Sequence, residues 1–169
     1  MMATNLLLIV DMQEGFRYRG NVKLTPRINR LIKGFEGGKA FCCFFDRKGS
    51  RFEKELKWSK FQKASSQKLL KEVNQAGLKV FRHSGYSILT KELLSFIGRS
   101  KPSSIYLCGI YSNVSISKAA LDLFDRGIDV KVIADATASD NGKAGHSHAI
   151  TTLVHALGRK NVVKTSEVI

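Results

Sequence analysis

The sequence predicts an α/β fold, a three-layer α/β/α Rossmann-like sandwich around a roughly six-stranded parallel sheet. Short apolar runs, typical of strands buried on both faces, alternate along the chain with segments of helical periodicity. Glycine or proline separates several of these segments. The length of 169 residues is close to that of one domain, so we expect residues 1–169 to form a single domain.

The first half of the chain alternates between predicted strands and helices. The apolar run 5–12 predicts a first strand, and Pro26 predicts the first turn of the helix that follows. The run 40–45 predicts a second strand. A helix is then expected over 66–75, followed by a third strand over 78–81.

The second half continues this alternation. Apolar residues at helical spacing predict the helices, and short apolar runs predict the strands. In chain order, the expected elements are helix 90–98, strand 104–111, helix 115–126, strand 130–134, helix 146–157 and strand 161–164. Helices between successive strands are typical of a parallel sheet whose right-handed crossovers place helices on both faces.

Polar residues follow the predicted strands at the edge where ligands bind in sheets of this kind. Ligands bind there because loops and helix amino termini converge outside the carboxyl ends of parallel strands. Asp11 ends the first strand and Asp46 the second, while the loops 83–87, 112–115 and 135–140 follow the next three. We therefore expect one polar pocket at this edge.

The net charge of +14 is the unusual bulk property of the chain. Much of the excess lies in residues 47–71, here called the basic segment, where cations recur every third residue from Arg51 to Lys63. Such a balance favours contact with nucleic acid, another polyanion, an anionic membrane surface or acidic small molecules. A simply solvated face is the other interpretation, since charge runs are often only surface.

The remaining composition favours a cytoplasmic domain. The run 6–10 is too short to span a membrane, lacks a preceding basic stretch and is followed by an acid, so we expect neither a signal peptide nor a membrane partner. Cys42, Cys43 and Cys108 lie within apolar strand-like runs, which predicts buried thiols rather than disulfides or metal ligands.

Four separated motifs carry a resemblance to a known family. They are LLLIVDMQEGF, RHSGYSILTKEL, LCGIYSNVSISKAALDLFDRGIDVKVIADATAS and HAITTLVHALGRKNVVKTSEVI. In order and spacing they resemble the isochorismatase-like hydrolases, also called cysteine hydrolases, over nearly the whole chain. The resemblance implies hydrolysis of an amide, ester or vinyl ether bond in a small molecule, and a homo-oligomer of two or more copies.

The resemblance also implies three catalytic positions, two of which depart from the family pattern. Asp11 matches the family's aspartate, a general acid or base. His83 stands where the family has lysine, and Ser115 stands where it has the nucleophilic cysteine. A hydroxyl needs a base to become a nucleophile, whereas a thiol is partly ionised near neutral pH.

These residue types leave more than one mechanism open. In a serine relay, His83 would take the Ser115 proton while Asp11 orients it, and the backbone N–H groups of Val114 and Ser115 would bind the oxyanion. In vinyl ether cleavage, Asp11 would donate a proton and water would attack. Ser115 could also be only a helix-cap hydroxyl. The residues expected to contact substrate are Phe16, Tyr86, Asn113 and Val114.

No metal or other cofactor is expected. Family members that use a metal carry an Asp-x-His set after the second strand, whereas this chain has Asp46-Arg47-Lys48, whose cations would repel a metal ion. Because the site is atypical, a second function stays open. The chain could be a catalytically impaired family member that acts as a binding or regulatory protein and engages polyanions through its basic surface.

Overall fold

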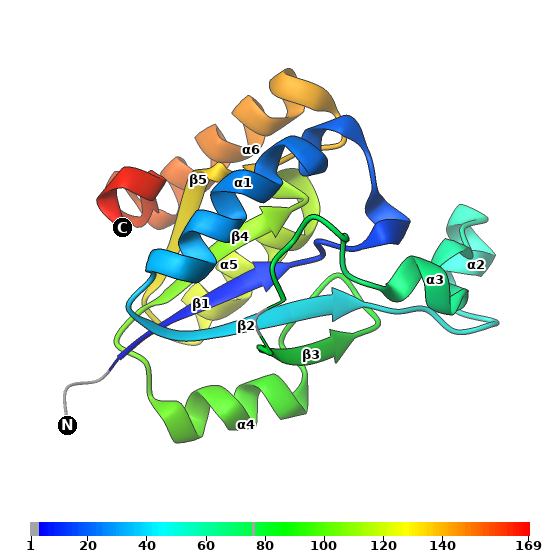
Figure 1. The fold of residues 1–169 in the computed structure, drawn as a ribbon, viewed down its shortest axis with the longest axis horizontal. Helices are drawn as coiled ribbons and strands as arrows, with labels where there is room; N and C mark the ends of the chain where they lie inside the picture. Colours follow the sequence, from blue (N-terminus) through cyan, green and yellow to red (C-terminus); the bar gives the residue numbers. More distant parts are fainter. Residues whose placement is uncertain (1–3, 76) are drawn as a thin grey trace.

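A six-stranded, fully parallel sheet forms the centre of the molecule, in a computed structural model that describes residues 4–75 and 77–169 (Figure 1). The strand order is β3-β2-β1-β4-β5-β6, which confirms the predicted fold class. The strands are β1 (Asn5–Val10), β2 (Gly37–Phe44), β3 (Lys79–His83), β4 (Ile105–Ile110), β5 (Val130–Ala138) and β6 (Val162–Val163).

Helices connect the strands and supply the outer layers. The α-helices are α1 (Arg19–Gly34), α2 (Arg51–Leu56), α3 (Ala64–Gln67), α4 (Lys91–Ser100), α5 (Ser117–Asp125) and α6 (Gly142–Leu157). Shorter helical turns are η1 (Glu14–Phe16), η2 (Lys60–Gln62), η3 (Ser112–Ile116), η4 (Arg159–Asn161) and η5 (Thr165–Glu167). In Figure 1, α2 and α3 lie beyond the arrowhead ends of β1, β2 and β3.

Each face of the sheet has its own hydrophobic core. On one face, Leu24, Ile28 and Leu31 of α1 pack against alternate side chains of β1 and β2. On the other face, α4, α5 and α6 pack against the intervening side chains of the same strands. This alternation is the period of two that strands impose, so the uninterrupted apolar runs of β1 and β4 reflect burial on both faces.

The helix expected to begin at Pro26 begins at Arg19 instead, and Pro26 lies inside α1. Proline removes one backbone N–H, which would leave the carbonyl of Val22 without its usual helical donor. The Thr25 hydroxyl donates to that oxygen at 2.8 Å and replaces the missing hydrogen bond. The helix can therefore continue through the proline.

The helix expected over 66–75 is also wrong, because α3 spans Ala64–Gln67 and only the first two residues of the expected range are helical. The following residues pair with the segment after β1. Leu70 N–H donates to the Met12 carbonyl at 2.9 Å, and Glu14 N–H donates to the Lys68 carbonyl at 2.8 Å. Leu70 is buried in this arrangement. The pairing with residues distant in sequence therefore explains why the segment is not helical.

The order of the strands changes direction between β1 and β4, which are neighbours in the centre of the sheet. Crossovers leave this point in opposite senses, so a crevice opens above the two strand ends. The strands approach closely there, because a Cβ atom on Gly109 would lie only 2.1 Å from the Val10 carbonyl oxygen. Asp11 and η3 extend directly from this junction.

Two bulk expectations can be compared with the structure. Cys42, Cys43 and Cys108 are buried and form no disulfide, as predicted, and burial raises the pKa of the Cys43 thiol to about 12. Within the part of the chain that the structure describes, we find no helix with both the length and the apolar character needed to cross a bilayer.

Candidate active site

Asp11 occupies a constrained position immediately after β1. Its φ of 55° lies in the left-handed region, where a non-glycine residue costs about 1 to 3 kcal/mol unless the surroundings hold it. Its N–H donates to the Cys42 carbonyl at 2.8 Å, and only 1% of the residue is exposed. The neighbouring strand thus fixes the direction in which this buried carboxylate points.

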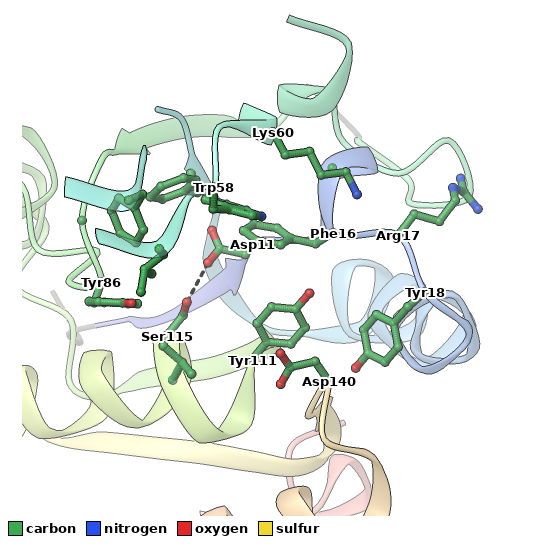
Figure 2. Close-up of a pocket in the computed structure, with 16 residues that line it drawn as sticks. Asp11, Phe16, Arg17, Tyr18, Trp58, Lys60, Tyr86, Tyr111, Ser115 and Asp140 are labelled. Atoms are coloured by element: carbon green, nitrogen blue, oxygen red, sulfur yellow. Dashed lines mark hydrogen bonds between the residues drawn. The ribbon is translucent and has the colours of Figure 1, made fainter. Parts of the chain in front are cut away.

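Both oxygens of the Asp11 carboxylate are hydrogen-bonded to the other two predicted catalytic residues. The Ser115 hydroxyl donates to Oδ2 at 2.8 Å, and His83 Nε2 lies 2.9 Å from Oδ1 (Figure 2 shows the bond to Ser115). All three side chains are buried. The ends of β1, β3 and β4 therefore bring together the carboxylate, imidazole and hydroxyl that the sequence placed at one edge.

Two acceptor groups favour the protonated form of His83. Nδ1 faces the Gly85 carbonyl oxygen at 2.9 Å, and Nε2 faces Asp11, so both ring nitrogens act as donors when the ring is protonated. Burial disfavours the charged ring, but the charge of Asp11 and the hydrogen bonds to Asp11 and Gly85 outweigh burial and raise the pKa.

The order of the three groups differs from that of a serine relay. Asp11 lies between His83 and Ser115, and no hydrogen bond joins the imidazole to the hydroxyl in the described parts of the chain. Because both its nitrogens already face acceptors, His83 has no lone pair directed at the Ser115 proton. The group placed to receive that proton is Asp11.

The turn that carries Ser115 is wider than an ordinary helix start. In η3, Ile116 N–H donates to the Tyr111 carbonyl at 3.0 Å, five residues earlier, and α5 begins only at Ser117. Val114 N–H donates to the same carbonyl at 3.1 Å. This N–H is therefore not available to an oxyanion in this structure, contrary to the expectation from the sequence.

A pocket of about 520 Å³ opens above the Asp11 and Ser115 side chains, a size suited to a small molecule. Among the predicted contact residues, Phe16, Tyr86 and Val114 line it. Asn113 is not in the lining but donates from Nδ2 to Asp140 at 3.3 Å. The remaining lining residues are Gly15, Arg17, Tyr18, Phe44, Phe52, Leu56, Trp58, Lys60, Gly85, Tyr111 and Asp140.

Aromatic residues form much of the pocket lining. The Phe16 ring stacks on Trp58 with centroids 6.1 Å apart and meets Tyr111 edge-on at 5.4 Å. Phe52 contacts both Trp58 and Tyr86. Such rings provide flat apolar surfaces for a planar or hydrophobic part of a ligand.

The basic segment supplies part of this wall. Its residues Phe52, Leu56, Trp58 and Lys60 line the pocket, while its nine lysine and arginine side chains are exposed. Within the described residues, none of the nine lies within 4.0 Å of a carboxylate oxygen. The sequence identified the charge of this segment but not that its aromatic residues reach the site.

The structure offers little support for a metal ion. Over residues 4–75 and 77–169, no group of three or more His, Cys, Asp or Glu side chains is arranged to hold one. Asp46 is buried and accepts a hydrogen bond from the Arg47 N–H at 2.8 Å through Oδ1, with its Oδ2 lacking a described partner. The absence of a metal requirement stays a prediction.

Comparison with known proteins identifies the family. The sequence profile of the isochorismatase domain matches residues 5–166. The chain belongs to the isochorismatase family. Isochorismatase family protein 2A of Dictyostelium discoideum is 42% identical over 62 residues, 36% of this chain and 31% of that protein. Isochorismatase domain-containing protein 2 of Xenopus laevis is 41% identical over 70 residues, 40% of this chain and 34% of that protein.

Solved structures show the same fold over almost the whole isochorismatase domain. An isochorismatase-like hydrolase from Alkaliphilus metalliredigens superposes with a TM-score of 0.86 and 17% identity, covering 98% of this chain and 97% of that one. N-carbamoylsarcosine amidase from Thermoplasma acidophilum gives a TM-score of 0.81 and 15% identity, covering 96% of both chains. The matches to the two curated relatives span only about a third of each relative.

Proposed function

We propose that this isochorismatase family member hydrolyses an amide or ester bond in a small molecule, with Ser115 as the nucleophile. The observation that carries the proposal is the 2.8 Å hydrogen bond from the Ser115 hydroxyl to Asp11 below a pocket of about 520 Å³. A nucleophile needs a base within hydrogen-bond reach, and Asp11 meets that requirement.

The proposed reaction has two steps that share one proton carrier. Ser115 Oγ attacks the substrate carbonyl carbon while its proton passes to Asp11 Oδ2. Asp11 then gives this proton to the leaving nitrogen or oxygen, and the bond to the carbonyl carbon breaks to leave an acyl-serine. A water molecule attacks the acyl-serine, Asp11 takes its proton, and return of a proton to Ser115 Oγ releases the carboxylic acid.

His83 acts in this scheme as a positioning and charge-stabilising residue. As an imidazolium it holds Oδ1 of Asp11, so that Oδ2 stays directed at the Ser115 hydroxyl. The motif resemblance matches this position to a lysine of the family, and the raised pKa of His83 favours the cationic form of the ring. The ring orients the base rather than serving as one.

Two structural neighbours support an amide as the bond to be broken. They are the N-carbamoylsarcosine amidase and a pyrazinamidase/nicotinamidase from Streptococcus mutans, which has a TM-score of 0.80 and 16% identity. At this identity the likeness concerns the fold, so it supports the reaction class by analogy only. The aromatic pocket wall of this chain independently favours a substrate with a planar or apolar part.

The proposal is tested by trapping the acyl-serine. Purified protein is mixed with a panel of small amides and esters, quenched in acid, digested and examined by mass spectrometry. We expect an acyl adduct on the peptide that contains Ser115, and loss of both adduct and turnover in Ser115→Ala. Ser117→Ala is the matched control, because its hydroxyl bonds the Ser112 carbonyl and does not line the pocket.

Adding isochorismate to the panel tests the vinyl ether alternative. If Asp11 donated a proton and water attacked, Ser115→Ala would keep most of its turnover of isochorismate while Asp11→Asn would lose it. No acyl adduct would form on the wild-type chain. This outcome would contradict the nucleophilic role of Ser115 but leave Asp11 as the central acid.

One observation favours a second function, the binding of a polyanion. The basic segment carries nine exposed cations but only two carboxylates, Glu53 and Glu55. If these cations bind nucleic acid, affinity falls steeply with rising salt because phosphate contacts release counterions. Fluorescence anisotropy with a labelled oligonucleotide measures this, and affinity independent of salt, or no binding, excludes the second function.

A further inference from the structure

One corner of the pocket carries a negative charge on a strongly basic protein. Asp140, in the loop between β5 and α6, lines the pocket together with Tyr18 and Tyr111. Figure 2 shows its carboxylate beside these two tyrosines, on the side of the pocket away from Lys60. The mechanism proposed above gives this carboxylate no role.

The Asp140 carboxylate lacks a cationic partner among the described residues. No lysine, arginine or histidine nitrogen in residues 4–75 and 77–169 lies within 4.0 Å of it, although the chain has 28 lysine and arginine residues. Its hydrogen bond comes from the neutral Asn113 Nδ2 at 3.3 Å. A carboxylate without a neighbouring cation in the described part of the chain therefore lies at the pocket wall.

Two residues near this carboxylate have a buried oxygen without a described hydrogen-bond partner. Because Asn113 Nδ2 donates to Asp140, the amide presents its Oδ1 elsewhere, and this oxygen is buried without a partner in the described structure. The Tyr18 hydroxyl is likewise buried and unpaired there. Buried polar atoms are normally satisfied, and of these two residues Tyr18 lines the pocket, so a ligand could supply the partner that its hydroxyl lacks.

The two tyrosines stay neutral, because burial and the nearby negative charge both raise the pKa of their hydroxyl groups. Burial and the charge of Asp140 raise the pKa of Tyr18 to about 12, and the same causes raise that of Tyr111 further. Their rings lie with centroids 5.9 Å apart and form an aromatic surface next to the carboxylate. Aromatic faces and a carboxylate together are a common environment for an alkylammonium group.

We infer that the corner formed by Asp140, Tyr18 and Tyr111 binds a protonated amine on the substrate while the scissile carbonyl lies at Ser115. An ammonium group has three donors and no acceptor, which matches the Asp140 carboxylate and the tyrosine oxygens of this corner. This inference rests on the proposed function for the position of the scissile bond. It adds that the substrate is cationic at the end remote from that bond.

Binding of three matched amides tests the inference. They are 4-(aminomethyl)benzamide, which is cationic, 4-methylbenzamide, which is neutral, and 4-carbamoylbenzoate, which is anionic. Calorimetry at low salt gives Kd for each with the wild-type chain, Asp140→Asn and Asp125→Asn. Asp125 is an exposed carboxylate at the end of α5 outside the pocket lining, so its variant controls for net charge.

We expect the wild-type chain to bind the cationic amide about fivefold more tightly than the neutral one, the size of a partly exposed ion pair. This ratio should fall to about one in Asp140→Asn and persist in Asp125→Asn. Equal or tighter binding of the anionic amide by the wild-type chain, or an unchanged ratio in Asp140→Asn, overturns the inference.

Hydrolysis of the same amides separates this inference from the proposed function. If the cationic amide binds preferentially but none of the three forms an acyl adduct, the ammonium site stands and the nucleophilic role of Ser115 fails. If the amides are hydrolysed without any preference for the cation, the proposed function stands and the ammonium site fails.

Discussion

The inner site and the basic segment meet at one pocket but are built in opposite ways. Asp11, His83 and Ser115 are buried, project from the ends of central strands and are joined by hydrogen bonds. The basic segment contributes α2, which has no buried residue, and it carries exposed cations. The comparison indicates that the strand ends hold the proposed catalytic groups in the core, whereas the pocket rim includes side chains from the exposed helix α2.

The largest effect should come from the centre of the inner site. In Asp11→Asn the amide cannot take the Ser115 proton, so we expect turnover to fall about 10³-fold, within the range for a lost general base. Asparagine tolerates the left-handed φ of 55°, so circular dichroism and thermal unfolding should show a folded chain. Leu56→Ala, on the basic segment, should lose less than about threefold. Comparable losses in the two variants would break the comparison.

A second prediction concerns the nucleophile itself. A thiol loses its proton to a carboxylate more readily than a hydroxyl does, so Ser115→Cys should raise turnover of amides about tenfold. Alkylation by iodoacetamide with and without substrate checks that the new thiol lies in the pocket. A fall in turnover, with the fold intact, would show that the inner site is adapted to a hydroxyl.

A third prediction is a pH dependence set by His83. Because its pKa in the folded chain is raised above the ordinary 6.5, its interaction with Asp11 stabilises the fold fully below that value. This stabilisation is lost as pH rises through the folded pKa. We expect turnover to fall about fivefold over the same interval, and His83→Lys to move the fall to higher pH. If turnover of His83→Lys had the same pH dependence as that of the wild-type chain, His83 would not be the titrating group.

The smallest predicted effect lies on the basic segment. Trp58→Ala removes an aromatic wall, so KM should rise about threefold while kcat stays nearly constant, as for lost uniform binding. Trp58→Ala should lower the free energy of unfolding less than Leu8→Ala does. Leu8 is fully buried, and its truncation should cost about 2 to 5 kcal/mol. A larger effect on kcat than on KM would show that the segment also positions the reacting groups.

Much of the architecture could be predicted from the sequence because the pattern of burial is local. The uninterrupted apolar runs 5–12 and 104–111 identify central strands, and the rule that ligands bind at their carboxyl ends placed Asp11, His83 and Ser115 at one edge. The motif resemblance then selected these three positions, rather than other polar residues at the same edge, as the catalytic candidates. The family and the parallel sheet are both confirmed.

The errors and omissions arise from contacts between distant residues. Leu69, Leu70 and Val73 have helical spacing, but the Leu70 N–H donates to the Met12 carbonyl, which is distant in sequence. Tyr18, just before α1, and Tyr111, just after β4, both line the pocket. No local sequence pattern distinguishes them from aromatic residues of the core. The order of hydrogen bonds, with Asp11 in the middle, follows from geometry that residue types alone do not contain.

The close approach of β1 and β4 at Gly109 limits how this protein can be re-engineered. Alanine there would force its methyl group against the Val10 carbonyl, at a φ of 109° that side chains rarely adopt. The resulting separation would spread the two strand ends and with them Asp11 and Ser115. Designs that exchange the base, the nucleophile or the aromatic wall must therefore keep this one residue, although it never meets a substrate.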